Sequence, residues 1–202
     1  MIKAILTLLL LISTAVQATP RPIIVVCDSL SAAYGIQLEA GWVSLLQHRL
    51  AEREYDHRVI NASISGDTTA GGLTRLPRTL ARYQPGIVVI ELGGNDGLRG
   101  LAFEQTRDNL EQMIRLARTA GARVLLLGMM MPPNFGKHFT EKFLQMYHDL
   151  AADKDVPFVP FFLAGVAEES SRMQEDGIHP NASGQPTMLD NVWPVLMTLL
   201  ER

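Results

Sequence analysis

Two residues that can share a proton stand three positions apart near the end of the chain, Asp176 and His179. A carboxylate at this distance can hold one nitrogen of the imidazole, which stabilises the charged ring and leaves the second nitrogen free to act as a base. Ser29, far earlier in the chain, follows an aliphatic run and carries a hydroxyl that becomes a good nucleophile only when such a base takes its proton. We therefore predict acyl transfer to Ser29, with His179 as the general base and Asp176 as the anion that orients it.

Each of these residues also has an ordinary structural explanation. Ser29 after a strand is a common helix N-cap, Asp176 before a glycine is a common turn residue, and His179 precedes a proline in a loop. The prediction therefore depends on whether the fold brings Ser29 to the other two. The remaining histidines lie in polar or helical surroundings and are expected at the surface: His48, His57, His138 and His148.

Two glycine-containing segments offer hydrogen-bond donors for an oxyanion. Gly66 has no side chain, so its N–H can approach a ligand closely, and Asn95 carries an amide inside a glycine-rich stretch. The N–H of Ser29 lies near the start of a helical stretch, where free N–H groups and the helix dipole favour an anion. The stretch 93–100 has four glycines in eight residues, which predicts a tight turn and then a flexible lid, with a mobile surface loop as the alternative.

Composition and missing motifs exclude several other classes of protein. The 202 residues, with 47% hydrophobic and 19% charged side chains, suit one globular domain with a sizeable core. The net charge of -3 and the lack of a basic block argue against nucleic acid as a partner. No metal-binding motif and no G-x-G-x-x-G after the first strand occur, so we expect neither a metal nor a cofactor. The G-x-S-x-G elbow of ordinary α/β-hydrolases is also missing.

The first residues of the chain have the pattern of a secretory signal. Lys3 precedes the aliphatic run 4–12, and small residues at 16 and 18 predict cleavage after Ala18. A membrane anchor is the alternative, but the apolar run is too short to span a bilayer. We therefore expect a signal peptide at 1–18, a single domain at 19–202, a periplasmic or secreted location and no stable membrane insertion. Cys27 is the single cysteine, so an internal disulfide is excluded.

Aliphatic runs and helical stripes alternate along the chain, which predicts a parallel sheet covered by helices on both faces. The expected strands are 22–27, 58–60, 87–92, 124–127 and 156–159, the last one at an edge because Pro157 interrupts it. The expected helical stripes run over 42–50, 110–117 with Gly121 as the cap, 143–151, and 188–196 with Ser183 and Pro186 at the entry. Pro194 either interrupts the last helix or starts a new one. Ligands of such sheets gather at the carboxyl ends of the strands, so Ser29, Gly66 and Asn95 should meet at one edge.

Taken in this order, four segments make the chain resemble the SGNH (GDSL-type) hydrolase family, and in particular its TesA-type branch of exported acyl-CoA thioesterases, lysophospholipases and arylesterases. These segments are Cys27–Ser31, Asn61–Thr68, Glu91–Gly100 and Asp176–Asn181. The resemblance implies a flavodoxin-like three-layer α/β/α sandwich with a five-stranded parallel sheet. It implies hydrolysis of carboxylic esters and thioesters, including acyl-CoA-type thioesters, aryl esters and lysophospholipids, through an acyl-enzyme.

The resemblance also implies roles for particular residues. Ser29, His179 and Asp176 are the expected catalytic residues. The N–H groups of Ser29 and Gly66 and the side chain of Asn95 are the expected oxyanion hole. The segment after Asn95 matches a loop that moves when acyl chains bind, so the expected substrate-binding residues are Asp96, Gly97, Leu98, Arg99, Gly100 and Leu101. The expected partner is a small acyl ester or thioester, with a monomeric protein and no cofactor.

The chain departs from the family at Cys27, where the family has glycine. The thiol either fits against the sheet as a small buried group or crowds the nucleophile and lowers activity. A third interpretation, that Cys27 is itself the nucleophile, is disfavoured because the other catalytic groups are expected around Ser29.

Two alternative functions stay open. One is a carbohydrate acetylesterase with the same catalytic residues, and the other is a non-catalytic acyl or lipid binder in which Cys27 has disabled the site. Apolar residues in the expected loops favour an acyl chain over a sugar, although core packing explains the methionines equally well: Leu98, Met129, Met130, Met131, Pro132, Pro133 and Phe135.

Overall fold

A computed structural model of the chain describes residues 20–200, so the predicted signal peptide lies outside the described residues. A five-stranded parallel sheet with the order β2-β1-β3-β4-β5 forms the centre of the fold. Its strands are β1 (Ile23–Cys27), β2 (Val59–Asn61), β3 (Ile87–Glu91), β4 (Arg123–Leu127) and β5 (Phe158–Val159). All five predicted strands are present, and β5 lies at the edge as Pro157 indicated.

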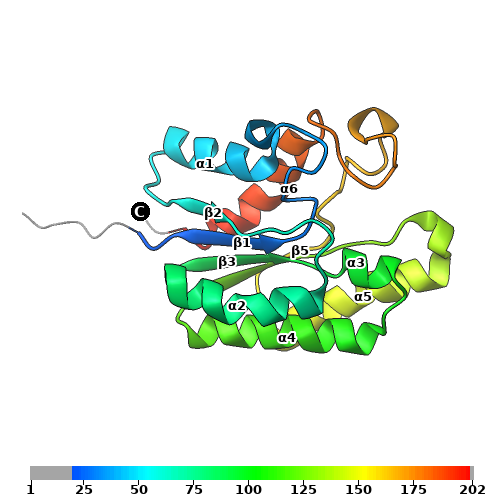
Figure 1. Cartoon of the computed structure of the whole chain (residues 1–202), viewed down its shortest axis with the longest axis horizontal. Helices are drawn as coiled ribbons and strands as arrows, with labels where there is room; N and C mark the ends of the chain where they lie inside the picture. Colours follow the sequence, from blue (N-terminus) through cyan, green and yellow to red (C-terminus); the bar gives the residue numbers. More distant parts are fainter. Residues whose placement is uncertain (1–19, 201–202) are drawn as a thin grey trace, which may run out of the picture.

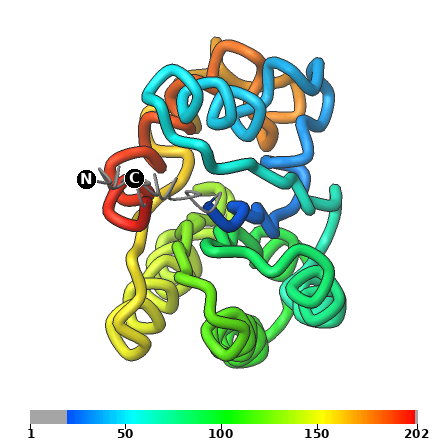
Figure 2. The backbone as a smooth tube through the Cα atoms, turned by 90° about the vertical axis from the view of Figure 1, so that its left-hand side faces the viewer, coloured from blue at the N-terminus to red at the C-terminus, as the bar shows by residue number. Residues whose placement is uncertain are grey.

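Helices cover both faces of the sheet, which confirms the predicted three-layer sandwich. Figure 1 shows α1 and α6 on one face and α2, α4 and α5 on the other, and the view in Figure 2 shows the same layers turned by 90°. The helices are α1 (Trp42–Glu52), α2 (Thr69–Tyr83), α3 (Gly94–Leu98), α4 (Phe103–Thr119), α5 (Lys137–Lys154) and α6 (Gln185–Met197). Three short 3-10 turns complete the described elements: η1 (Leu38–Ala40), η2 (Pro133–Phe135) and η3 (Ser170–Arg172).

The central strands are buried on both faces because their sequences are aliphatic throughout. Every residue of β1 and β3 is buried, as expected for strands that have helices above and below them. The chain leaves β1 toward β2 on one side and returns to β3 on the other, so the connections diverge at the carboxyl ends of β1 and β3. Such a divergence opens a crevice at the sheet edge, and the segments just after β1 and β3 carry Ser29 and Asn95.

The structure corrects several details of the sequence analysis. Helix α2 was not among the predicted stripes, because Gly71, Gly72 and Pro77 hide its pattern. Gly72 is needed there, since a Cβ atom at this position would lie 2.2 Å from Cδ1 of Leu92, the residue just after β3.

The last helix and one histidine also differ from expectation. Helix α6 runs through Pro194 without a break, and its N-cap is Gly184 and not Ser183. His57 is buried, so its prediction as a surface residue is wrong, whereas the other three histidines predicted at the surface are exposed.

Candidate active site

The fold brings Ser29, His179 and Asp176 into one hydrogen-bonded chain. The Oγ of Ser29 lies 2.9 Å from Nε2 of His179. Nδ1 of His179 lies 2.6 Å from Oδ2 of Asp176. This arrangement places a base next to the serine hydroxyl and an anion behind the base, as nucleophilic catalysis requires.

A tight turn sets the geometry of the acid–base pair. Oδ1 of Asp176 accepts hydrogen bonds from the N–H groups of Ile178, at 2.9 Å, and His179, at 3.0 Å. The N–H of His179 is the main cause that lowers the pKa of Asp176 from 3.8 to about 2, with help from the His179 ring and the Ile178 N–H. Asp176 is therefore charged at neutral pH and can orient the ring.

Two residues that the sequence analysis did not single out hold His179 in place. The ring of Tyr34 stands 4.5 Å from the His179 ring, centroid to centroid. Gln174 donates from Nε2 to the carbonyl oxygens of Tyr34, at 2.8 Å, and Pro180, at 3.1 Å. The N–H of Gln174 donates to the carbonyl of His179 at 2.7 Å. Gln174 thus links the loop that contains His179 to the segment that follows Ser29.

Ser29 lies in a tight turn just after β1, and this turn is followed by further turns and not by a regular helix. Asp28 shapes the turn, because its Oδ1 accepts the N–H of Leu30 at 3.0 Å. Its Oδ2 accepts a hydrogen bond from Nδ2 of Asn95 at 2.9 Å. The turn that carries Ser29 and the side chain of Asn95 are therefore joined directly.

Gly66 lies in the turn between β2 and α2 and has a φ of +78°, a conformation that favours glycine. Its carbonyl accepts a hydrogen bond of 2.8 Å from Nη2 of Arg99, just beyond α3. The turn that carries Gly66 is thus linked to the helix that carries Asn95. The loops after β1, β2 and β3 meet at one edge of the sheet, to the right in Figure 1, as predicted from the alternation of strands and helices.

Cys27 lies inside the sheet, at the end of β1 and in register with Glu91 of β3. Its side chain is fully buried and does not line the pocket beside Ser29. Burial, reinforced by the neighbouring charge of Glu91, raises the pKa of the thiol well above its usual range. A buried, protonated thiol is a poor nucleophile, so this geometry agrees with Ser29 as the attacking group.

A pocket of about 310 Å³ opens beside the serine. Its polar end contains Ser29, Asn95 and His179. Its walls are mostly apolar and come largely from the loops after β4 and β5: Leu98, Met129, Met130, Met131, Pro132, Pro133, Phe161, Leu163, Met173 and Ile178. The shape suits an apolar chain whose reactive end lies at the serine.

The segment after Asn95 is largely the short helix α3 and not an open loop, so its residues point in different directions. Of the six residues expected to contact substrate, Leu98 lines the pocket and the others do not. Asp96 and Gly97 are buried, and Oδ2 of Asp96 accepts the N–H of Thr69 at 2.9 Å. The other three are exposed outside the pocket: Arg99, Gly100 and Leu101. The structure therefore supports substrate contact for Leu98 alone among the six.

Among residues 20–200, no three or more His, Cys, Asp or Glu side chains gather so as to hold a metal ion. No helix in the same range is long and apolar enough to cross a membrane.

A serine–histidine–carboxylate chain at the carboxyl edge of a parallel sheet is the arrangement of a serine hydrolase, built here on an α/β/α sandwich. The chain belongs to the GDSL-like lipase/acylhydrolase family, which matches residues 28–185, and it is an ester-cleaving enzyme. Membership confirms the resemblance inferred from the four sequence segments.

Known relatives cover most of the chain. It is 55% identical over 184 residues to Esterase TesA of Pseudomonas aeruginosa, covering 91% of this chain and 92% of the relative. It is 43% identical to an arylesterase of Vibrio mimicus, covering 93% of each. It is 42% identical to thioesterase 1/protease 1/lysophospholipase L1 of Escherichia coli K12, covering 91% of this chain and 86% of the relative. A crystal structure of TesA superimposes with a TM-score of 0.87 at 55% identity, covering 89% of this chain and 99% of that one.

Proposed function

We propose that the enzyme hydrolyses carboxylic esters and thioesters through an acyl-enzyme on Ser29. The observation that carries the proposal is the contact of 2.9 Å between Ser29 Oγ and His179 Nε2 at the mouth of an apolar pocket. Ser29 attacks the acyl carbonyl while His179 takes its proton, and Asp176 stabilises the charged ring. His179 then protonates the leaving alcohol or thiol. It next activates the water that releases the acid and frees the serine.

Three donors are proposed to hold the oxyanion: the N–H groups of Ser29 and Gly66 and the amide of Asn95. The hydrogen bond to Asp28 uses one N–H of the Asn95 amide and leaves the second one for the oxyanion. A donor whose direction is set before the reaction costs no reorganisation when the charge develops. Asp28 therefore contributes by orienting Asn95.

The apolar walls favour an acyl chain as the part of the substrate that enters the pocket. The relatives are named as esterase, arylesterase and thioesterase/lysophospholipase, so acyl-CoA-type thioesters, aryl esters and lysophospholipids are the proposed substrates. A sugar would find few polar partners along these walls, which argues against a carbohydrate acetylesterase. The intact serine–histidine–aspartate chain argues against a non-catalytic lipid binder.

We further propose that residues 1–18 form a cleaved signal peptide, that residues 19–202 form the hydrolase domain and that the enzyme acts as a periplasmic or secreted monomer. The pattern of Lys3, the aliphatic run and the small residues before position 19 supports export. N-terminal sequencing of the exported protein, with light scattering of the purified product, tests both statements. A start at Thr19 and a monomeric mass are the expected results.

Hydrolysis of p-nitrophenyl esters from acetyl to palmitoyl, by the wild-type enzyme and by Ser29→Ala, tests the proposed function. We expect activity that requires Ser29 and an optimum above acetyl, because longer chains bury more apolar surface in the pocket. Full activity in Ser29→Ala would reject the nucleophile, and an optimum at acetyl would favour the acetylesterase.

A further inference from the structure

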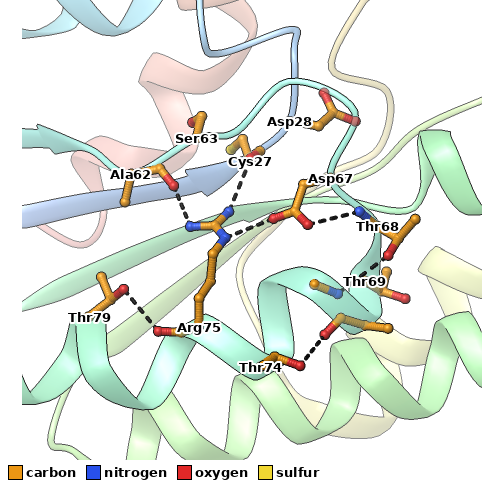
Figure 3. A network of polar contacts seen from close by, with 12 residues as sticks. Cys27, Asp28, Ala62, Ser63, Asp67, Thr68, Thr69, Thr74, Arg75 and Thr79 are labelled. Atoms are coloured by element: carbon orange, nitrogen blue, oxygen red, sulfur yellow. Dashed lines mark hydrogen bonds and ion pairs between the residues drawn. The ribbon is translucent and has the colours of Figure 1, made fainter.

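The guanidinium of Arg75, on α2, hydrogen-bonds to residues of two separate segments, the end of β1 and the loop between β2 and α2 (Figure 3). Its Nε donates to Oδ2 of Asp67 at 2.7 Å. Its Nη1 donates to the carbonyl of Ala62 through a short hydrogen bond, and its Nη2 donates to the carbonyl of Cys27 at 3.3 Å. One planar group therefore binds three acceptors, two in the loop between β2 and α2 and one at the end of β1.

These acceptors flank the groups proposed to act on the substrate. Ala62 and Asp67 stand on either side of Gly66 in the loop between β2 and α2, and Cys27 lies two residues before Ser29. Arg75 thus connects the Gly66 loop to the strand end that carries the nucleophile.

The first turn of α2 leaves room for the carboxylate that holds Arg75. A Cβ atom at Gly71 would lie 1.9 Å from Oδ1 of Asp67, so a side chain at this position would displace the aspartate. The same Oδ1 accepts the N–H of Thr68 at 3.1 Å, and the Thr68 side chain caps the helix by accepting from Gly71 N–H. The carboxylate of Asp67 is therefore held by the N–H of Thr68 at one oxygen and by the guanidinium of Arg75 at the other.

Arg75 acts at a distance from the substrate. It does not line the pocket beside Ser29, and its side chain is 19% exposed against 11% for Asp67. We propose that Arg75, held by Asp67, is a positioning residue that fixes the N–H of Gly66 relative to Ser29 for the oxyanion. This proposal rests on the proposed function.

Arg75→Lys keeps the positive charge and removes the planar fork that reaches three acceptors. We expect kcat for p-nitrophenyl esters to fall about tenfold to a hundredfold, because a misplaced donor loses transition-state stabilisation. KM should stay within about twofold, since the pocket is untouched. Arg78→Lys, an exposed position on the same helix, is the matched control and should behave as wild type.

A merely structural role is separated from a positioning role by counting active sites. Titration with a p-nitrophenyl phosphonate gives the concentration of competent enzyme, and kcat is divided by that concentration. If the loss in Arg75→Lys disappears after this division, the residue only supports folding and the proposal is overturned. A kcat that equals wild type without correction also overturns it.

Gly71→Ala gives a second, independent test that does not change the arginine. Alanine favours a helix more than glycine does, so the change should not weaken α2 itself. It should push Asp67 aside and lower kcat per competent site in the same direction as Arg75→Lys. If Arg75→Lys does not fold, this variant decides alone, and wild-type kcat in Gly71→Ala overturns the proposal. Ser29→Ala tests the proposed function separately from the role of Arg75. Activity in Ser29→Ala would reject the proposed function, whatever the results for Arg75→Lys and Gly71→Ala.

Discussion

At the scale of single residues, Asp28 is buried, which disfavours its charged form, but it accepts two hydrogen bonds that need this form. The residue is only 2% exposed, yet its carboxylate must stay an acceptor for both Leu30 N–H and the amide of Asn95. Burial raises its pKa from 3.8 to about 6, against the lowering effect of the Leu30 N–H, the His179 charge and the Asn95 amide. The charged form is therefore present at neutral pH at some cost in stability.

Asp28→Asn should flatten the pH dependence of stability. Because the folded pKa lies above the unfolded value, the folded state binds the proton more tightly, and the free energy of unfolding falls as the pH rises from about 4 to about 6. Without the Asp28 carboxyl group, the free energy of unfolding should decrease by up to about 3 kcal/mol less across that pH range. Urea unfolding at several pH values measures this difference.

The same variant should also lose activity at neutral pH. Asparagine offers one oxygen, so either the Leu30 N–H or the Asn95 amide loses its acceptor. An Asp28→Asn enzyme with wild-type kcat would contradict the role of Asp28 in orienting Asn95.

Cys27 gives a second prediction at this scale. Because its side chain is buried in β1 and away from the pocket, Cys27→Gly should not raise kcat by more than about twofold. It should lower the free energy of unfolding by about 1–2 kcal/mol, since it leaves a small cavity and a flexible residue in a strand. Ester hydrolysis and urea unfolding measure the two effects. A gain of tenfold or more in kcat would show that the thiol crowds the native site.

At the scale of elements, a buried polar network joins α2, α3 and α4. The Oγ1 of Thr69, at the start of α2, donates to Oδ1 of Asp96 in α3 at 2.5 Å. It also accepts from Nδ2 of Asn109 in α4 at 3.0 Å. All three side chains are buried, so the network replaces the water that these groups would otherwise bind. It explains why Asp96 faces the interior and not the substrate.

Thr69→Val keeps the shape of the side chain and removes the hydroxyl from this network. Asp96 and Asn109 would each lose a buried partner, so we expect a loss of about 1–3 kcal/mol in the free energy of unfolding. Thr74→Val, an exposed position on the same helix, should change stability by no more than about 0.5 kcal/mol. Equal stability of the two variants in urea unfolding would show that the network contributes little.

The elements that could be predicted are those whose pattern reflects burial alone. The unbroken aliphatic runs of β1 and β3 identify strands with helices on both faces. Helix α2 was missed because Gly71, Gly72 and Pro77 are unusual inside a helix. Gly71 makes room for Asp67, four residues earlier, and Gly72 makes room for Leu92, further along the chain. Leu76 and Leu80 do recur at helical spacing, but the need for glycine opposite Leu92 depends on a contact that the local sequence does not reveal.

The same distinction holds within the site. Ser29, Asp176 and His179 could be proposed because their chemistry is unusual in combination. The sequence could not point to Tyr34, Gln174 and Arg75 in the same way. Their contacts are with backbone carbonyls or with a ring face, and contacts of these kinds leave no sequence pattern.

At the scale of the whole molecule, the sheet order places all the proposed catalytic groups at one edge. The segments that follow β1, β2 and β3 carry Ser29, Gly66 and Asn95, the last in the short helix α3. The loops after β4 and β5 supply most of the apolar walls. The buried core beneath fixes the positions of these segments relative to one another. A small domain can therefore combine the proposed nucleophile, its base and an apolar pocket.

The central claim is that Ser29 is the residue that carries the acyl group. The most direct test is to react the enzyme with a p-nitrophenyl alkylphosphonate and to locate the adduct by fragmenting the peptide that contains both Cys27 and Ser29. The account predicts one phosphonate per chain, attached to Ser29, and a rate of labelling that falls about a thousandfold or more in His179→Ala. An adduct on Cys27, or labelling of Ser29 at an unchanged rate without His179, would contradict it.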